Sequence, residues 1–322
     1  MPDSPTFRVA AVQAAPVFLD LQATIDKACA LIAEAGAAGA KLVVFPEGFV
    51  PAYPLWCWLI PAGQTAALRE LYVELLEQSV AVPGPETARL AAAARSAGVH
   101  VAIGINERNA EASGTSLYNS LLYIRDDGEI LGVHRKLVPT AGERLIHAAG
   151  DGSTLQVHDL SIGRLSGLIC WENYMPLARY ALYAAGVEIY VAPTWDRGEP
   201  WLSTLRHIAK EGRMVVIGAC MALRKADIPD RFEFKRRYLA EAPEWINPGD
   251  SAIVDPDGKL LAGPAREVET ILYAEVARSR ITGPRWQLDV AGHYGRPDVF
   301  RLSVDRRPRP MVAEASEAEP EF

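Results

Sequence analysis

The sequence predicts a mixed α/β fold in one domain, and three observations support this. Strand-like apolar runs alternate with amphipathic helical stretches through most of the 322 residues. Asp-Gly turns at 126–128 and 255–258 each separate two strand-like runs, which predicts antiparallel hairpins. No Gly/Ser-rich linker or abrupt change in composition precedes residue 300. We therefore expect one domain over residues 1–304 and a disordered tail over 305–322, where apolar residues are too few to pack.

Each element of the first half is predicted by its periodicity. The helix after Asp20 places Leu21, Ile25, Ala28 and Ile32 on one face and ends near Gly36 and Gly39. The run 41–45 is apolar throughout, as expected for a strand covered on both faces. The other expected elements are strands at 8–13, 99–105, 120–125 and 129–133 and helices at 64–78 and 85–97.

The second half repeats the alternation. Pro176 opens a helical stretch over 177–185 that Gly186 closes, and a second helix is expected at 201–211. The expected strands are 164–170, 188–192, 214–220, 251–254 and 259–262. Because the two hairpins require antiparallel pairing, a purely parallel doubly wound sheet is disfavoured.

Composition excludes several classes of partner. A net charge of −7 and a pI near 5.5 argue against nucleic acid or an anionic membrane surface. The basic stretch 231–237 is expected to be a solvated face or a subunit contact. We expect neither a signal peptide nor a membrane span, because no apolar run is long enough. The four cysteines form no C-x-x-C pair, so we expect no metal, no cofactor and no disulfide framework, and a cytoplasmic protein.

Three chemically distinct side chains close strand-like runs: Glu47, Lys136 and Cys170. A carboxylate, an ammonium and a thiol at strand ends are the groups needed for covalent chemistry on an electron-poor carbon. The plainer alternatives are an exposed acid, a surface lysine and a buried inert cysteine. Polar residues directly after Cys170 favour the reactive alternative, and the helix that follows is expected to stabilise its thiolate.

The surroundings of Glu47 strengthen this hypothesis. Because Glu47 ends an apolar strand, burial should raise the pKa of its carboxyl toward the range of a general base. The aromatic stretch 49–58 that follows is expected to form a pocket wall. Glu143 offers a second acid within loop reach of Lys136.

The motifs resemble those of the nitrilase superfamily, and specifically its true nitrilase branch, over residues 8 to about 300. The resemblance rests on short segments that occur in the family's order. They are Phe45-Pro-Glu-Gly-Phe-Val-Pro-Ala-Tyr-Pro54, His134-Arg-Lys-Leu-Val-Pro-Thr140, Gly150-Asp-Gly-Ser153, Cys170-Trp-Glu-Asn173, Ala192-Pro-Thr-Trp-Asp196, His207–Arg213 and Ala291–Asp298.

The resemblance implies an α-β-β-α sandwich that pairs into an α-β-β-α-α-β-β-α homodimer or a larger homo-oligomer. It also implies that Cys170 is the nucleophile, Glu47 the general base, Lys136 the electrostatic stabiliser and Glu143 an auxiliary acid. Trp171 and Glu172 directly after the cysteine favour nitriles, because amidases of the superfamily more often carry tyrosine or another residue there. The implied reaction converts a small-molecule nitrile and two waters into a carboxylic acid and ammonia through a thioimidate and a thioester.

Alternatives within and beyond the superfamily remain open. The same residues also suit an amidase, an N-carbamoyl hydrolase or a cyanide-degrading enzyme, whereas a non-catalytic scaffold would need a damaged triad. Many nitrilases carry tryptophan and glycine where this chain has His147 and Ala148. His147 is therefore either a residue of the pocket rim or a plain loop histidine. The expected substrate-binding residues, chosen for their nearness to the motifs, are Tyr53, Trp56, Trp171, Thr194 and Trp195.

Overall fold

The structure, a computed structural model, describes residues 6–111 and 113–310. Its first sheet contains both parallel and antiparallel neighbours in the order β13-β1-β2-β3-β4-β5. The strands are β1 (Thr6–Gln13), β2 (Ala40–Val44), β3 (His100–Arg108), β4 (Leu117–Ile124), β5 (Ile130–Arg135) and β13 (Thr270–Ala277). The sequence analysis missed β13, which pairs along the whole of β1.

The second sheet has the order β10-β11-β9-β8-β7-β6, and β12 pairs with β11. Its centre, β7-β8-β9, is parallel, and its edges are antiparallel. The strands are β6 (His158–Leu160), β7 (Gly163–Gly167), β8 (Ile189–Val191), β9 (Val215–Gly218), β10 (Ala222–Arg224), β11 (Trp245–Val254) and β12 (Leu260–Arg266). Both predicted hairpins, β4-β5 and β11-β12, are present.

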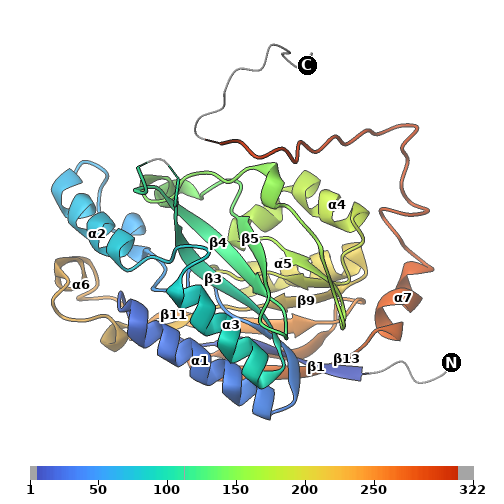
Figure 1. The fold of residues 1–322 in the computed structure, drawn as a ribbon, viewed down its shortest axis with the longest axis horizontal. Helices are drawn as coiled ribbons and strands as arrows, with labels where there is room; N and C mark the ends of the chain where they lie inside the picture. Colours follow the sequence, from blue (N-terminus) through green and yellow to red (C-terminus); the bar gives the residue numbers. More distant parts are fainter. Residues whose placement is uncertain (1–5, 112, 311–322) are drawn as a thin grey trace.

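Helices cover the outer face of each sheet (Figure 1). The helices α1 (Leu21–Ala37) and α3 (Pro85–Ala97) lie on the first sheet, and α4 (Pro176–Ala184) and α5 (Glu199–Gly212) lie on the second. The remaining helical segments are α2 (Thr65–Glu77), α6 (Glu233–Tyr238), α7 (Ser279–Arg285) and the short turns η1 (Leu55–Trp58), η2 (Ala141–Leu145), η3 (Gly152–Thr154), η4 (Cys170–Tyr174) and η5 (Lys225–Asp227).

Strand alternation divides the core into layers. In β1, Val9 and Ala11 pack between the two sheets, whereas Ala10 and Val12 face α1 and α3. The central layer also contains residues from both sheets, and these are Leu42, Val44, Ile189, Val191, Val215 and Ile217. Because successive side chains of a strand point to opposite faces, an apolar strand can serve two layers at once. The predicted α-β-β-α sandwich is confirmed.

One predicted boundary that differs bears directly on Cys170. The strand expected over 164–170 ends at Gly167, and Cys170 instead opens the 3₁₀ turn η4. The Asp20 side chain caps α1 as the sequence indicated, by accepting a hydrogen bond from Ala23 N. In the basic stretch 231–237, Arg231, Arg236 and Arg237 are exposed while Phe232 and Phe234 are buried, which agrees with a solvated face. The alternative, a subunit contact, stays a prediction.

The segment after α7 runs as an extended arm along the second helical layer (Figure 1). Arg309 N donates to the Asp151 carboxylate over 2.8 Å, so the first residues of the predicted tail contact the domain. The rest of that tail, 311–322, lies outside the described residues. Among the residues described, no helix combines the length and apolarity needed to cross a bilayer.

Gly167 is required where β7 approaches β8. A Cβ at this position would lie 1.9 Å from the Val191 carbonyl oxygen. We predict that Gly167→Ala lowers the free energy of unfolding by about 1–3 kcal/mol or more, because the strands would have to separate. Urea unfolding measures this. Gly63→Ala is the control, since no atom lies within 4 Å of its Cβ, and it should change stability by less than about 0.5 kcal/mol. Equal effects would contradict the packing argument.

Candidate active site

The predicted catalytic residues converge at one end of the sandwich. Glu47 follows β2 and Lys136 follows β5, both in the first sheet, while Cys170 follows β7 in the second. Since β2 and β5 run in the same direction, their carboxyl ends lie at the same edge of the sheet. All three side chains are buried, together with Glu143 from η2.

Lys136 lies between two buried carboxylates. Its Nζ is 2.8 Å from Glu47 Oε1 and 2.8 Å from Glu143 Oε2. An ammonium has three protons, so two are directed at the carboxylates and one remains for another acceptor. Isolated buried charges are costly, and this shared geometry lets each charge offset another.

The two carboxyls respond differently to this arrangement. Burial raises the pKa of Glu47 and exceeds the opposing effect of Lys136, which confirms the expected direction. Burial alone would also raise the pKa of Glu143. The charge of Lys136 and the hydrogen bonds from Lys136, Thr140 N and the Tyr53 hydroxyl outweigh it, so the pKa of that carboxyl is lowered. Burial opposes the charge of Lys136, yet Glu47, the Cys170 sulfur and Glu143 hold its pKa well above the usual range. The raised pKa makes Glu47 the better proton acceptor of the two carboxyls, whereas the lowered pKa of Glu143 favours its ionised form.

Cys170 has a strained backbone, with φ of 53° in the left-handed region. Its amide donates to the Pro193 carbonyl over 2.9 Å, which holds the turn against the residues after β8. The predicted thiolate stabilisation is wrong for the free enzyme: burial, with Glu47 second, raises the pKa of the thiol to about 12. The reason is that η4 separates Cys170 from the start of α4 at Pro176, and desolvation dominates.

Thr194 contacts the sulfur directly. Its Oγ1 lies 3.3 Å from Cys170 Sγ and accepts a hydrogen bond from Asp196 N over 2.7 Å. Because a hydroxyl has a single proton and the amide already occupies a lone pair, that proton is directed at the sulfur. The contact lowers the pKa of the Cys170 thiol, against burial.

Two of the predicted substrate-binding aromatics belong to this cluster. Tyr53 donates its hydroxyl proton to Glu143 Oε1 over 2.7 Å and stacks on Trp195, with ring centroids 4.6 Å apart. Trp195 N donates to Glu47 Oε2 over 2.7 Å. Trp58, which the sequence analysis did not select, donates to the Tyr53 hydroxyl over 2.8 Å. The stacked pair therefore contacts both carboxylates, Glu143 through the Tyr53 hydroxyl and Glu47 through the backbone N–H of Trp195.

The other two aromatics lie differently. Trp56 is fully buried, with its ring packed against Phe18 and Phe234. Trp171 is 51% exposed, and its Nε1 donates to the Asp196 carboxylate over 2.7 Å. For both residues, substrate contact remains a prediction.

Asn119 in β4 was missed by the sequence analysis. Its Nδ2 donates to Glu47 Oε1 over 2.8 Å, and its backbone carbonyl accepts from Lys136 N. An amide inside an otherwise apolar, fully buried strand was a usable signal.

Glu172 and His134 form a second buried pair that received no role from the sequence. Glu172 Oε2 lies 2.9 Å from His134 Nε2, and both side chains are almost fully buried. The carboxylate also accepts backbone N–H groups from Leu137 and Ile169. The Ile169 contact is local, at the start of η4, whereas His134 and Leu137 lie more than thirty residues before Glu172, so sequence spacing carries no signal for those two.

His147 is buried rather than an exposed loop residue. Its Nε2 lies 2.8 Å from Asn106 Oδ1. The Asn106 amide nitrogen donates to the carbonyls of Val50 and Ala52, so His147 supports the wall that leads to Tyr53. Burial lowers the pKa of His147 to about 4, and the imidazole is therefore neutral near pH 7.

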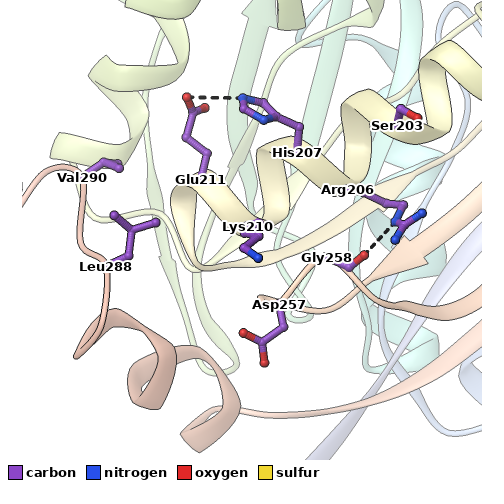
Figure 2. Close-up of a pocket in the computed structure, with 9 residues that line it drawn as sticks. All are labelled: Ser203, Arg206, His207, Lys210, Glu211, Asp257, Gly258, Leu288 and Val290. Carbon is purple, nitrogen blue, oxygen red and sulfur yellow. Dashed lines mark hydrogen bonds and ion pairs between the residues drawn. The ribbon is translucent and has the colours of Figure 1, made fainter.

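Three surface cavities among the described residues are lined by none of the four predicted catalytic residues, although His147 lines one of them. One of about 600 Å³ lies beside α5, lined by residues that include Arg206, Lys210 and Asp257 (Figure 2). Its histidine, His207, pairs with Glu211 one helical turn later. Among residues 6–111 and 113–310, no group of three or more His, Cys, Asp or Glu side chains is arranged to hold a metal ion.

A profile of the carbon-nitrogen hydrolase family matches residues 8–285. The chain belongs to this family. Among its relatives, an aliphatic nitrilase of Sinorhizobium fredii is 44% identical over 95% of this chain and 98% of its own length. Nitrilase 1 of Arabidopsis thaliana is 40% identical over 98% of this chain and 92% of its own. A bifunctional nitrilase/nitrile hydratase of Nicotiana tabacum is 41% identical over 94% and 86%.

Solved structures share the fold of this carbon-nitrogen hydrolase. The NitFhit protein of C. elegans superposes with a TM-score of 0.70 and 20% identity, covering 96% of this chain and 69% of that protein. Nit3 of Saccharomyces cerevisiae gives 0.65 and 20%, covering 91% and 97%. At this identity the likeness extends to the fold alone.

The Thr194 contact generates a prediction for this hydrolase. Thr194→Val should slow alkylation of Cys170 by iodoacetamide by about 10- to 100-fold, because a hydrogen bond to a charged group contributes about 1.5–3 kcal/mol. Thr194→Ser retains the hydroxyl and is the control, expected to react at close to the native rate. Mass spectrometry of the modified peptide gives the rates. Equal rates for the valine and serine variants would exclude the sulfur contact as the cause.

Proposed function

We propose that the protein is a nitrile aminohydrolase in which Cys170 is the nucleophile. The observation that carries the proposal is the Lys136 ammonium held between Glu47 and Glu143 beside the buried thiol. The similarity to nitrilases along nearly the whole chain supports nitriles as the substrate class. The nitrile carbon is a weak electrophile, and a sulfur nucleophile suits it.

The first half of the reaction begins with transfer of the thiol proton from Cys170 to Glu47. Glu47 Oε1 already accepts from Asn119 and Lys136, whereas Oε2 accepts only Trp195 N among the described residues, so Oε2 has room for the thiol proton. Because the pKa of the thiol is raised, this transfer accompanies the attack instead of preceding it. The sulfur–carbon bond forms, one C–N π bond breaks, and the nitrogen takes the proton that Glu47 accepted from the thiol. The products are a thioimidate and an ionised Glu47 that can act as a base again.

The charge that develops on the nitrile nitrogen needs a donor. The third proton of Lys136 serves this purpose, together with the backbone N–H after Cys170. Glu47 then activates a water that adds to the thioimidate carbon, and ammonia leaves to give a thioester. A second water releases the carboxylic acid and restores the thiol. The sum is nitrile plus two waters to acid plus ammonia.

Substrate preference and compartment follow from the same groups. The Tyr53–Trp195 stack presents an aromatic surface next to both carboxylates, which favours aryl or arylalkyl nitriles.

All four cysteines are free thiols, and a thiol nucleophile requires a reducing compartment, for which we propose the cytoplasm.

Turnover of a substrate panel tests the proposal. Purified protein incubated with phenylacetonitrile, mandelonitrile and short aliphatic nitriles should release ammonia and the matching acids. Cys170→Ala should retain the melting temperature and abolish release, since the covalent intermediate cannot form. Chromatography separates acid from amide. Ammonia from amides or N-carbamoyl compounds, with none from any nitrile, would establish the other C–N hydrolase activity instead.

We also propose that the chain forms at least a homodimer, through the outer face of α4. Leu177 on this helix is 68% exposed, and Tyr174 just before it is half exposed. A cavity of about 1470 Å³ lies between α4 and the arm at 290–306, so apolar surface there is not covered by the chain itself.

Sedimentation tests this assembly. The native protein should sediment as a dimer or larger species at micromolar concentration, and Leu177→Glu should shift it toward monomer, because a buried unpaired carboxylate opposes association. The exposed Val73→Glu variant on α2 is the control and should leave the assembly unchanged. A native monomer would contradict the proposal.

A further inference from the structure

The buried carboxylate of Glu172 bridges the two segments that carry the nucleophile and the ammonium. Its Oε1 accepts Leu137 N over 2.8 Å, one residue after Lys136, and its Oε2 accepts Ile169 N over 2.9 Å, one residue before Cys170. The first segment extends β5 of one sheet, and the second extends β7 of the other. A single rigid group therefore spans the gap between the sheets at the site.

His134 fixes the orientation of this carboxylate. Its Nε2 faces both Glu172 oxygens, at 3.1 and 2.9 Å, and its Nδ1 faces the Thr154 carbonyl at 3.3 Å. Both ring nitrogens thus face acceptors, so both must donate, which requires the imidazolium. Burial opposes that charge, yet the Glu172 carboxylate and the Thr154 carbonyl raise the pKa of His134.

The carboxylate is likewise held in its charged form. Burial acts to raise the pKa of Glu172, but His134 and the two backbone N–H groups lower it. A carboxylate can accept at four lone-pair positions, whereas an amide in its place presents donors on one side. Glutamine at 172 would therefore turn an NH₂ group toward either Leu137 N or Ile169 N.

We propose that Glu172 is a positioning residue that sets the separation of Lys136 from Cys170 during turnover. It does not reach the reacting atoms. Its two backbone contacts keep the ammonium where charge develops on the substrate nitrogen, once the sulfur has attacked. This role rests on the proposed function, because it concerns the step in which that nitrogen gains charge.

Glu172→Gln should lower kcat by about 100-fold, the cost of a misplacement of about 1 Å, with KM changed by less than about threefold. Alkylation of Cys170 by iodoacetamide should fall by less than about fivefold, because this reaction places no charge on a nitrogen beside Lys136. The split between turnover and alkylation distinguishes misplacement of Lys136 from general damage to the thiol.

Glu188→Gln is the matched control. Glu188 is also buried, accepts Arg164 N over 3.0 Å and pairs with Arg278, but it precedes β8 at the opposite end of the same sheet. It should lower the melting temperature while kcat stays within about twofold. Equal kcat losses in both variants at matched melting temperatures would overturn the proposal, and so would a rise in KM at unchanged kcat.

Glu172→Asp keeps the negative charge facing His134 but is one methylene shorter, so it cannot reach both backbone groups. This variant serves if the glutamine variant does not fold. Its kcat should fall at least about tenfold, and native kcat in folded Glu172→Asp would overturn the proposal. If the wild-type protein hydrolyses amides and no nitriles, the proposed function fails on its own, and the same comparison is then made on the amide.

Discussion

The site depends on one ammonium placed between two carboxylates in a region without solvent. Lys136 would be prohibitively costly to bury alone, and so would Glu47 or Glu143. Together they keep opposite charges close and divide the protonation behaviour, with the pKa of one carboxyl raised and that of the other lowered. The roles of base and permanent anion thus arise from environment, since the two side chains are chemically identical.

Around this centre, hydrogen bonds remove the remaining freedom. Asn119 and Trp195 N hold Glu47, while Tyr53 and Thr140 N hold Glu143. Glu47 is restrained from both sheets, and Glu143 is restrained by groups that follow β2 and β5 of the first sheet. The geometry therefore does not have to be organised when substrate binds. Such preorganisation is the main source of electrostatic stabilisation of a transition state.

The sequence predicted most strands and both hairpins because strand alternation and the two Asp-Gly turns are local signals, whereas the layers were implied by the resemblance to the family. It located Glu47, Lys136 and Cys170 for a similar reason: each is a reactive side chain closing an apolar run. It did not indicate the contacts of Glu172 with Leu137 N and His134, because both partners lie more than thirty residues away in the chain. It also gave the wrong sign for the thiol, because the cost of burial depends on how tightly the turn packs, which no local pattern reveals. The strand β13 was missed because its only strong partner is β1, at the other end of the chain.

Because the site is built from two different sheets, it does not exist until the two sheets have packed together during folding. The acid–base groups come from one sheet, and the sulfur and its threonine come from the other. A nascent molecule whose layers have not yet closed therefore carries a thiol without a base or a counter-charge beside it. Burial acts on this sulfur only once the layers close, so the folded domain assembles the groups around the thiol and at the same time shields a sulfur that is solvated in the open chain.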